Sequence, residues 1–208
     1  MQEIKEQSWL KKIPPVIGLI LIIDVICIVL FMFNYLGAGA LTRYGLLPRS
    51  EPLFMPLLLA PLLHGSWAHL WANLLPFTLL SWLASRYGSR EYLLLLLVVW
   101  FGGGLLLWCI GRPAYHIGLS GVIYGLWGYL LVYALMHRSF KALAIGAVVL
   151  VLYAVMWQGL IPGQLSGQWH VSVEGHLSGA LVGGLYAYFC ARRHKKRESE
   201  NIHKNKSR

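Results

Sequence analysis

The chain has 208 residues, of which 57% are hydrophobic and only 12% are charged. A soluble domain carries about twice that share of charged residues, so this composition excludes an ordinary soluble fold and indicates several membrane spans. The net charge is +10, but eight of the 18 lysines and arginines lie within residues 192–208. We therefore expect a solvated, disordered basic tail at the membrane face and no folded surface for nucleic acid.

Six apolar segments are long enough to cross a membrane, which takes about 20 residues each. They are Val16–Leu36, Ser66–Ala84, Tyr92–Ile110, Leu119–Met136, Ala142–Leu160 and Val171–Cys190. The predicted fold class is an all-α membrane protein built as a six-helix bundle. Residues 1–15 form a cytoplasmic N-terminal segment, residues 16–190 form the membrane domain, and residues 191–208 form the basic cytoplasmic tail.

The basic residues between the spans predict the orientation of the chain. With six crossings, one side of the membrane carries the following residues together with the basic tail: Lys5, Lys11, Lys12, Arg86, Arg90, Arg138 and Lys141. The other side keeps only Arg43, Arg49 and Arg112. Because lysine and arginine accumulate in cytoplasmic loops, we expect a multi-pass protein of the plasma (bacterial inner) membrane with both termini cytoplasmic.

The first outer connection, residues 37–65, contains an apolar run from Leu53 to Leu63 that is too short to span the membrane. Pro52, Pro56 and Pro61 interrupt it, and proline resists a continuous helix. We expect a partly membrane-embedded, interfacial or re-entrant segment. The alternative is that this run lengthens the second span.

Ionisable and polar side chains gather at one depth, toward the outer ends of spans two, four and six. They are His64, His69, Asn73, His116, Ser120, Glu174 and His176. Such groups are costly in lipid and need an explanation. Their convergence from three separate spans predicts a water-accessible site inside the bundle.

A serine and a histidine of this layer form a plausible nucleophile and base, Ser120 and His176. Small residues recur at a spacing of four beside each of them: Gly121 and Gly125 in span four, Gly179 and Gly183 in span six. Such pairs let helix backbones approach closely. Spans four and six are therefore predicted to pack tightly enough for the two side chains to meet.

The same pattern suggests how an oxyanion would be held. Ser120 begins a helix, so its backbone N–H has no partner within the helix. His69 and Asn73 are four residues apart and share a helix face. No acid completes a triad, because Glu174 is only two residues from His176 and faces elsewhere. Tyr124 is placed to stack on the imidazole, so we predict a Ser–His dyad.

Three motifs in chain order resemble those of the rhomboid family of intramembrane serine proteases. They are His64-Gly-Ser-Trp-Ala-His69-Leu-Trp-Ala-Asn73, then Gly118-Leu-Ser120-Gly121-Val-Ile-Tyr124-Gly125, then Gly175-His176-Leu-Ser-Gly179-Ala-Leu-Val-Gly183. Each motif alone is weakly specific. Their order and their shared depth make the combined resemblance highly specific, and it extends over residues 16–190.

The resemblance implies a serine endopeptidase that cleaves the transmembrane segments of other membrane proteins near the outer face, through an acyl-enzyme. It implies no cofactor and no metal, and its partners would be transmembrane substrates and the lipid bilayer. It implies that His69, Asn73 and the Ser120 amide hold the oxyanion, and that substrates enter near span five and the first loop. The implied supporting residues are His64, Gly118, Gly121, Tyr124, Gly179 and Gly183.

Some residues leave alternatives open. The Trp-Arg pair often found in the family's first loop is absent, and Arg49 is among the nearest substitutes. Asp24 is either a proton or ion site or, as we favour, a buried carboxylate paired with a hydroxyl, a backbone group or water. His116 fits a cavity or substrate contact as well as it fits loop packing.

Other functions remain as competing hypotheses. A catalytically silent relative would bind transmembrane clients, although it would not need both Ser120 and His176. A transporter or channel is disfavoured because no inverted repeat is visible and the inner half carries little charge apart from Asp24. A membrane-embedded esterase would carry Gly-x-Ser-x-Gly on a strand, whereas Ser120 is followed directly by glycine on a helical pattern.

Overall fold

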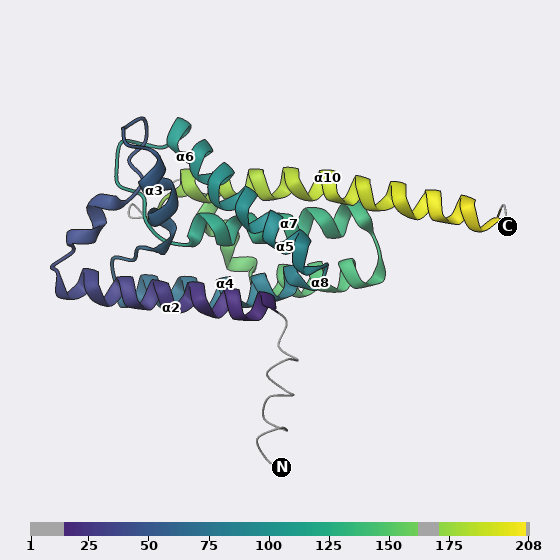
Figure 1. Cartoon of the computed structure of the whole chain (residues 1–208), viewed down its shortest axis with the longest axis horizontal. Helices are drawn as coiled ribbons and strands as arrows, with labels where there is room; N and C mark the ends of the chain where they lie inside the picture. Colours follow the sequence, from purple (N-terminus) through teal and green to yellow (C-terminus); the bar gives the residue numbers. More distant parts are fainter. Residues whose placement is uncertain (1–14, 162–170, 207–208) are drawn as a thin grey trace, which may run out of the picture.

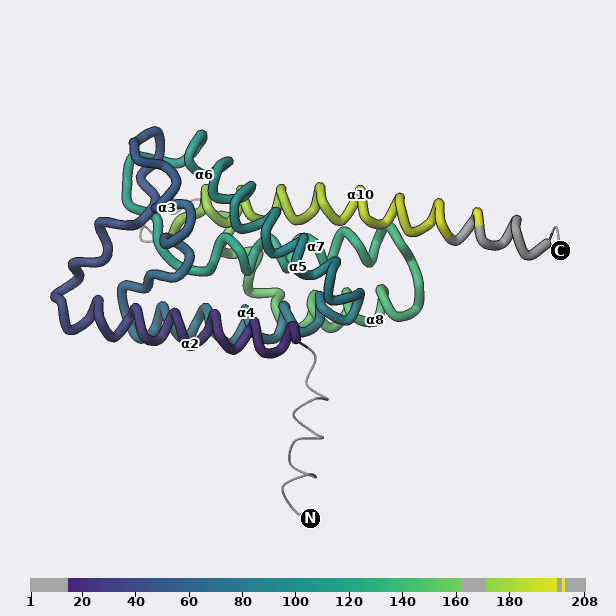
Figure 2. Tube along the Cα trace, viewed as in Figure 1, coloured from purple at the N-terminus to yellow at the C-terminus, as the bar shows by residue number. Residues whose placement is uncertain are grey.

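The computed structural model describes residues 15–161 and 171–206 and consists of a bundle of six helical rods (Figure 1). The rods are α2 (Pro15–Leu36), α4 (Trp67–Ser85), the continuous series α5 (Ser89–Leu97), π-helix η3 (Val98–Gly103) and α6 (Gly104–Ile110), α7 (Ser120–His137), the bent pair α8 (Phe140–Leu152) and η4 (Ala154–Leu160), and α10 (Val173–Lys206). This confirms the predicted all-α bundle. Figure 2 shows the first outer loop at one end of the bundle and the start of α2 at the other.

By length and composition, three of the described helices can cross a membrane: α2, residues 89–110, and α7. Counting the pair α8 and η4, which bends by 67°, as one span raises the number to four. Helices α4 and α10 are long enough, but their hydropathy is too low for them to be counted as membrane spans. They carry the polar side chains of the predicted site, including His69, Asn73, Glu174 and His176, and these lower their hydropathy.

Helix α7 lies at the centre of the bundle and packs most closely against α10. The contact is made by backbone: a Cβ added at Gly179 would collide with the carbonyl oxygen of Gly121, and one at Gly183 with that of Gly125. Only glycine permits this approach. The close packing predicted from the two pairs of small residues is therefore present.

Substituting Gly183 with alanine is expected to destabilise the bundle by about 1–3 kcal/mol, because the new methyl group meets only backbone atoms of Gly125, which cannot rotate away. Thermal unfolding in detergent measures the effect. Gly18→Ala in α2 is the matched control, since a Cβ there meets nothing within 4 Å. Equal stability of the two variants would contradict the backbone contact.

The first outer loop forms short helices of its own: η1 (Ala40–Tyr44), α3 (Phe54–Leu59) and η2 (Ala60–Leu62). Leu63 is extended, and α4 begins afresh at Trp67 with the Ser66 side chain as its cap. The alternative that this run lengthens the second span is therefore wrong. The prolines and the new cap explain the break.

Hydrogen bonds fasten this loop to the rod formed by residues 89–110. The Arg49 guanidinium donates to the carbonyl oxygens of Cys109 (3.1 Å) and Gly111 (2.9 Å). The indole N–H of Trp100 donates to the Leu57 carbonyl oxygen at 3.1 Å. Arg49 thus anchors the loop in a chain that lacks the expected Trp-Arg pair.

Two expectations away from the site are also resolved. The Thr78 hydroxyl donates to Asp24 at 2.6 Å, which supports a hydroxyl-paired carboxylate. The tail was expected to be disordered, and this is wrong through Lys206, where α10 ends. A helix of 34 residues is about 51 Å long and exceeds the hydrocarbon core, about 30 Å thick. The lysines at positions 5, 11 and 12 lie outside the described residues.

Candidate active site

Ser120 is the first residue of α7 and lines two cavities. The small one, about 50 Å³, lies against the first loop and the rod of residues 89–110. The large one, about 900 Å³, is bounded by α4, η4 and the start of α10. Gly118 directs the chain into this position, with a left-handed φ of 105° and an N–H that donates to the Ala60 carbonyl oxygen at 2.9 Å.

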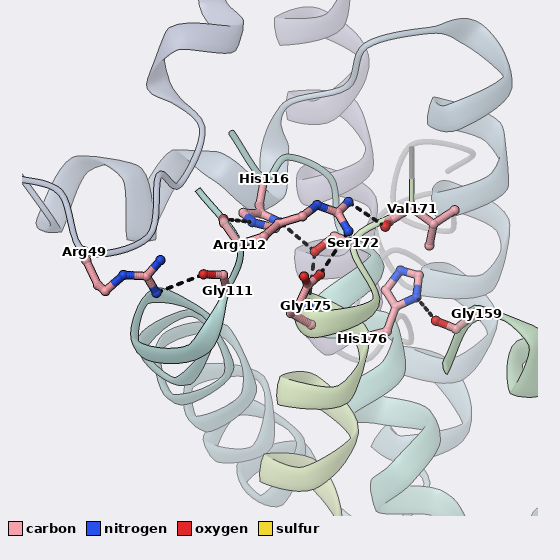
Figure 3. Close-up of polar contacts among 10 residues, drawn as sticks. Arg49, Gly111, Arg112, His116, Gly159, Val171, Ser172, Gly175 and His176 are labelled. Atoms are coloured by element: carbon pink, nitrogen blue, oxygen red, sulfur yellow. Dashed lines mark hydrogen bonds and ion pairs between the residues drawn. The ribbon is translucent and has the colours of Figure 1, made fainter. Parts of the chain in front are cut away.

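His176 lies in the first turns of α10, buried with 7% of its surface exposed. Its Nδ1 is 2.8 Å from the carbonyl oxygen of Gly159 in η4 (Figure 3). Because a carbonyl oxygen only accepts hydrogen bonds, Nδ1 must carry the proton. The other ring nitrogen, Nε2, is thereby left with a free lone pair, as a general base requires.

Tyr124 fixes the plane of the same imidazole. The two rings are stacked, with centroids 4.0 Å apart and an angle of 12° between their planes. The Tyr124 hydroxyl donates to the Met156 carbonyl oxygen at 2.7 Å, so η4 holds both the tyrosine and the histidine. The stacking predicted from the sequence is present.

Ser120 and His176 lie on the wall of the same large cavity. Their backbones meet beside it, where a Cβ on Gly121 would be 3.4 Å from the Gly175 carbonyl oxygen. Within the part of the chain that the structure describes, no direct hydrogen bond joins the two side chains. The two side chains therefore share one cavity.

The predicted oxyanion donors line this cavity too. The Asn73 amide nitrogen donates to the His69 carbonyl oxygen at 2.7 Å, which leaves its second hydrogen for another acceptor. The His69 ring lies directly against Gly118, where any Cβ would collide with it. The His69 ring thus lies at the turn that leads into Ser120, and Asn73 borders the same cavity.

His64 lies apart from the cavity and supports the first loop. Its ring is fully buried, with Nδ1 3.3 Å from the Leu62 carbonyl oxygen, and its own carbonyl oxygen accepts from Asn34 at 3.2 Å. Burial, reinforced by the neighbouring His69, lowers the pKa of His64 to about 4. The ring is therefore neutral near pH 7, as packing without a charged partner requires.

Glu174 points away from the dyad. Its carboxylate pairs with Arg112 at 3.4 Å, and Arg112 also donates to the Val171 carbonyl oxygen at 2.8 Å (Figure 3). Within residues 15–161 and 171–206, no acid is hydrogen-bonded to His176. The Gly159 carbonyl oxygen takes the place that an aspartate holds in a triad.

Sequence reasoning missed the contributions of Gly159 and Met156. Both act through backbone carbonyl groups, which every residue carries, so no pattern of side chains reveals them. The only signal was a glycine near the end of the fifth span.

Residues 52–193 match the family model of the rhomboid domain. The chain belongs to the rhomboid family. The match includes all three motifs that carried the resemblance. An uncharacterized protein of Mycobacterium tuberculosis is 36% identical to this rhomboid over 165 residues, which is 76% of the present chain and 68% of the relative.

Two further relatives of this rhomboid lie in other organisms. An uncharacterized protein of Mycobacterium leprae is 38% identical over 137 residues, covering 62% of this chain and 53% of the relative. A protein of Acanthamoeba polyphaga mimivirus that is named as a rhomboid protein is 29% identical over 128 residues, covering 59% and 67%. Family membership supports a function like that of an intramembrane protease.

Proposed function

We propose that this rhomboid is an intramembrane serine endopeptidase that cleaves transmembrane segments near the outer membrane face with a Ser120–His176 dyad. The observation that carries the proposal is the hydrogen bond from His176 Nδ1 to the Gly159 carbonyl oxygen, 2.8 Å long. It selects the tautomer with a basic Nε2 beside the cavity that Ser120 lines. Its place on the wall that Ser120 also lines distinguishes His176 from His64, whose Nδ1 also contacts a carbonyl oxygen but which does not border this cavity.

The reaction follows from the arrangement of these groups. His176 Nε2 accepts the proton of the Ser120 hydroxyl as Oγ attacks the scissile carbonyl carbon. The negative oxygen that forms is held by the Ser120 N–H, Asn73 and His69. His176 then protonates the leaving amine, and water hydrolyses the acyl-enzyme by the same steps in reverse. Each step needs only groups that border the large cavity.

The large cavity also supports the expected route of the substrate. Its wall includes Pro76 of α4 and residues of α8 and η4 such as Leu152 and Met156. We propose that a transmembrane substrate enters between these elements and exposes an extended segment to Ser120. The start of α2 and the end of α10 lie at the opposite end of the bundle from the first loop (Figure 1), which supports placing both termini on the same side of the membrane. We propose that this is the cytoplasmic side of the plasma membrane.

Labelling with a fluorophosphonate tests the proposal without a known substrate. The purified protein in detergent should react at Ser120. The Ser120→Ala variant should lose the label, because the reagent needs an activated serine and an unactivated serine hydroxyl is a poor nucleophile. Ser85→Ala at the far end of α4 is the matched control and should label normally. If the wild-type protein stays unlabelled while an active serine protease reacts, the protease proposal fails and binding of transmembrane clients becomes the leading function.

A further inference from the structure

A second serine–histidine contact lies beside the proposed dyad. His116, in the loop between α6 and α7, places Nδ1 2.6 Å from the Ser172 hydroxyl oxygen and Nε2 3.1 Å from the Arg112 carbonyl oxygen (Figure 3). Because the carbonyl oxygen only accepts, Nε2 carries the ring proton and Nδ1 accepts the hydroxyl proton of Ser172. His116 is buried, with 5% of its surface exposed.

The two residues occupy matching places in the chain. His116 lies four residues before Ser120, and Ser172 lies four residues before His176. Ser172 also caps α10, since its hydroxyl oxygen accepts the Gly175 N–H at 3.1 Å and its carbonyl oxygen accepts the His176 N–H at 3.0 Å. The contact therefore joins the segment that leads into the nucleophile to the turn that carries the base.

The His116 backbone also connects the segment before α7 to the first outer loop. Its N–H and carbonyl group exchange two hydrogen bonds of 2.9 Å with Leu46. With side chain and backbone both engaged, the start of α7 cannot shift against α10 unless the His116–Ser172 contact breaks.

We propose that His116 and Ser172 are a positioning pair that sets the separation of Ser120 and His176, and that protonation of His116 releases it. The inference rests on the proposed protease function and adds regulation of the protease activity by acidic pH. Protonated Nδ1 becomes a donor, so the hydrogen bond with the Ser172 hydroxyl reverses its direction and the buried ring gains a positive charge that burial and the Arg112 charge disfavour. A charged His116 is more stable where water reaches it, which favours opening of the contact with Ser172. The start of α10 is then held less firmly against the loop before Ser120.

The surroundings of His116 place this switch at acidic pH. Burial is the main influence and lowers the pKa of His116 from its ordinary value of 6.5, while the Arg112 carbonyl oxygen and Glu174 act in the opposite direction and the Arg112 charge lowers it further. The other titratable groups that border the same cavity lie on every element around it: His69 on α4, Arg112 and Tyr115 in the loop before α7, Tyr124 on α7, Tyr153 before η4 and His176 on α10. His116 is therefore neutral near pH 7 and gains its proton only below its ordinary pKa.

The test compares rate constants of fluorophosphonate inactivation. His116→Phe removes the acceptor and is expected to slow labelling about tenfold, the scale of a small misplacement of reacting groups. His116→Asn keeps an acceptor near the position of Nδ1 and should stay within about threefold of wild type. His137→Phe, at the far end of α7, is the matched control and should react normally. Ser172→Ala combined with His116→Phe should be no slower than Ser172→Ala alone.

The pH profile gives a readout that a purely structural role would not move. The rate of wild type relative to His116→Asn should fall as the pH drops below about 6.5, because only wild type carries the second titrating imidazole. A constant ratio would overturn the switch, and a normal rate for a folded His116→Phe would overturn the positioning role. A label found on Ser172 in Ser120→Ala would make Ser172 a nucleophile instead. Absence of labelling in wild type would overturn the proposed function itself.

Discussion

Replacing His176 with alanine is expected to slow cleavage of a transmembrane substrate about 10³- to 10⁴-fold, because it removes the group proposed to take the Ser120 proton. His176 borders the cavity with a free Nε2, whereas Glu174 is engaged with Arg112. The measurement is the cleavage rate of a reporter transmembrane segment in reconstituted vesicles. His137→Ala, at the far end of α7, removes an imidazole elsewhere and should cleave at the normal rate.

The pH dependence of the His176→Ala variant sharpens this test. Without a general base, the reaction depends on hydroxide to ionise the Ser120 hydroxyl, so the residual rate should rise about tenfold per pH unit through the alkaline range. The wild-type rate should level off once His176 is neutral. A His176→Ala variant that cleaves at the wild-type rate would eliminate His176 as the base and leave Ser120 without its activating group.

Replacing Gly159 with alanine is expected to slow cleavage about a hundredfold, the cost of a misplacement near 1 Å at a reacting centre. A Cβ at this position would collide with the Tyr124 hydroxyl and lie 3.0 Å from His176 Nδ1. The methyl group therefore pushes η4 away from both rings. The hydrogen bond between the Gly159 carbonyl oxygen and His176 lengthens, and the imidazole loses the acceptor that selects its tautomer.

A second substitution separates this effect from simple misfolding. Tyr124→Phe removes the hydroxyl that the new methyl group would strike, so the double variant Gly159→Ala/Tyr124→Phe should recover part of the lost rate. Tyr124→Phe alone loses only the hydrogen bond to Met156 and keeps the stacked ring. The rates of the four proteins form a double-mutant cycle. Purely additive losses would show that a methyl group at position 159 does not collide with the Tyr124 hydroxyl. This result would contradict the proposed role of η4 in orienting His176.

The position of these contacts links substrate entry to the state of the dyad. Gly159 and Met156 belong to η4, the bent end of the fifth rod, which also borders the large cavity. A substrate that enters beside η4 touches the element that orients His176 and Tyr124. Under the proposed mechanism and entry route, the base would be held by the part of the bundle that a substrate meets first.

Residue patterns in the sequence predicted much of the candidate site. The three motifs placed His69 and Asn73 on one helix and Ser120 and His176 on two others, and all four residues border the large cavity. Two contacts of the site could not be predicted from the sequence. Gly159 contributes a carbonyl group, and Ser172 contributes a cap that meets His116. Both depend on how distant segments cross, which a local pattern does not encode.

The sequence by itself predicted the six helical rods and the close packing of α7 on α10. Apolar length decides what can cross a membrane, and glycines at a spacing of four decide where two backbones can touch. Only the tertiary structure decided which nitrogen of His176 is basic, that Arg49 anchors the first loop, and that the basic tail continues α10. A tautomer depends on the one acceptor within hydrogen-bond reach, and that acceptor came from a segment 17 residues away along the chain.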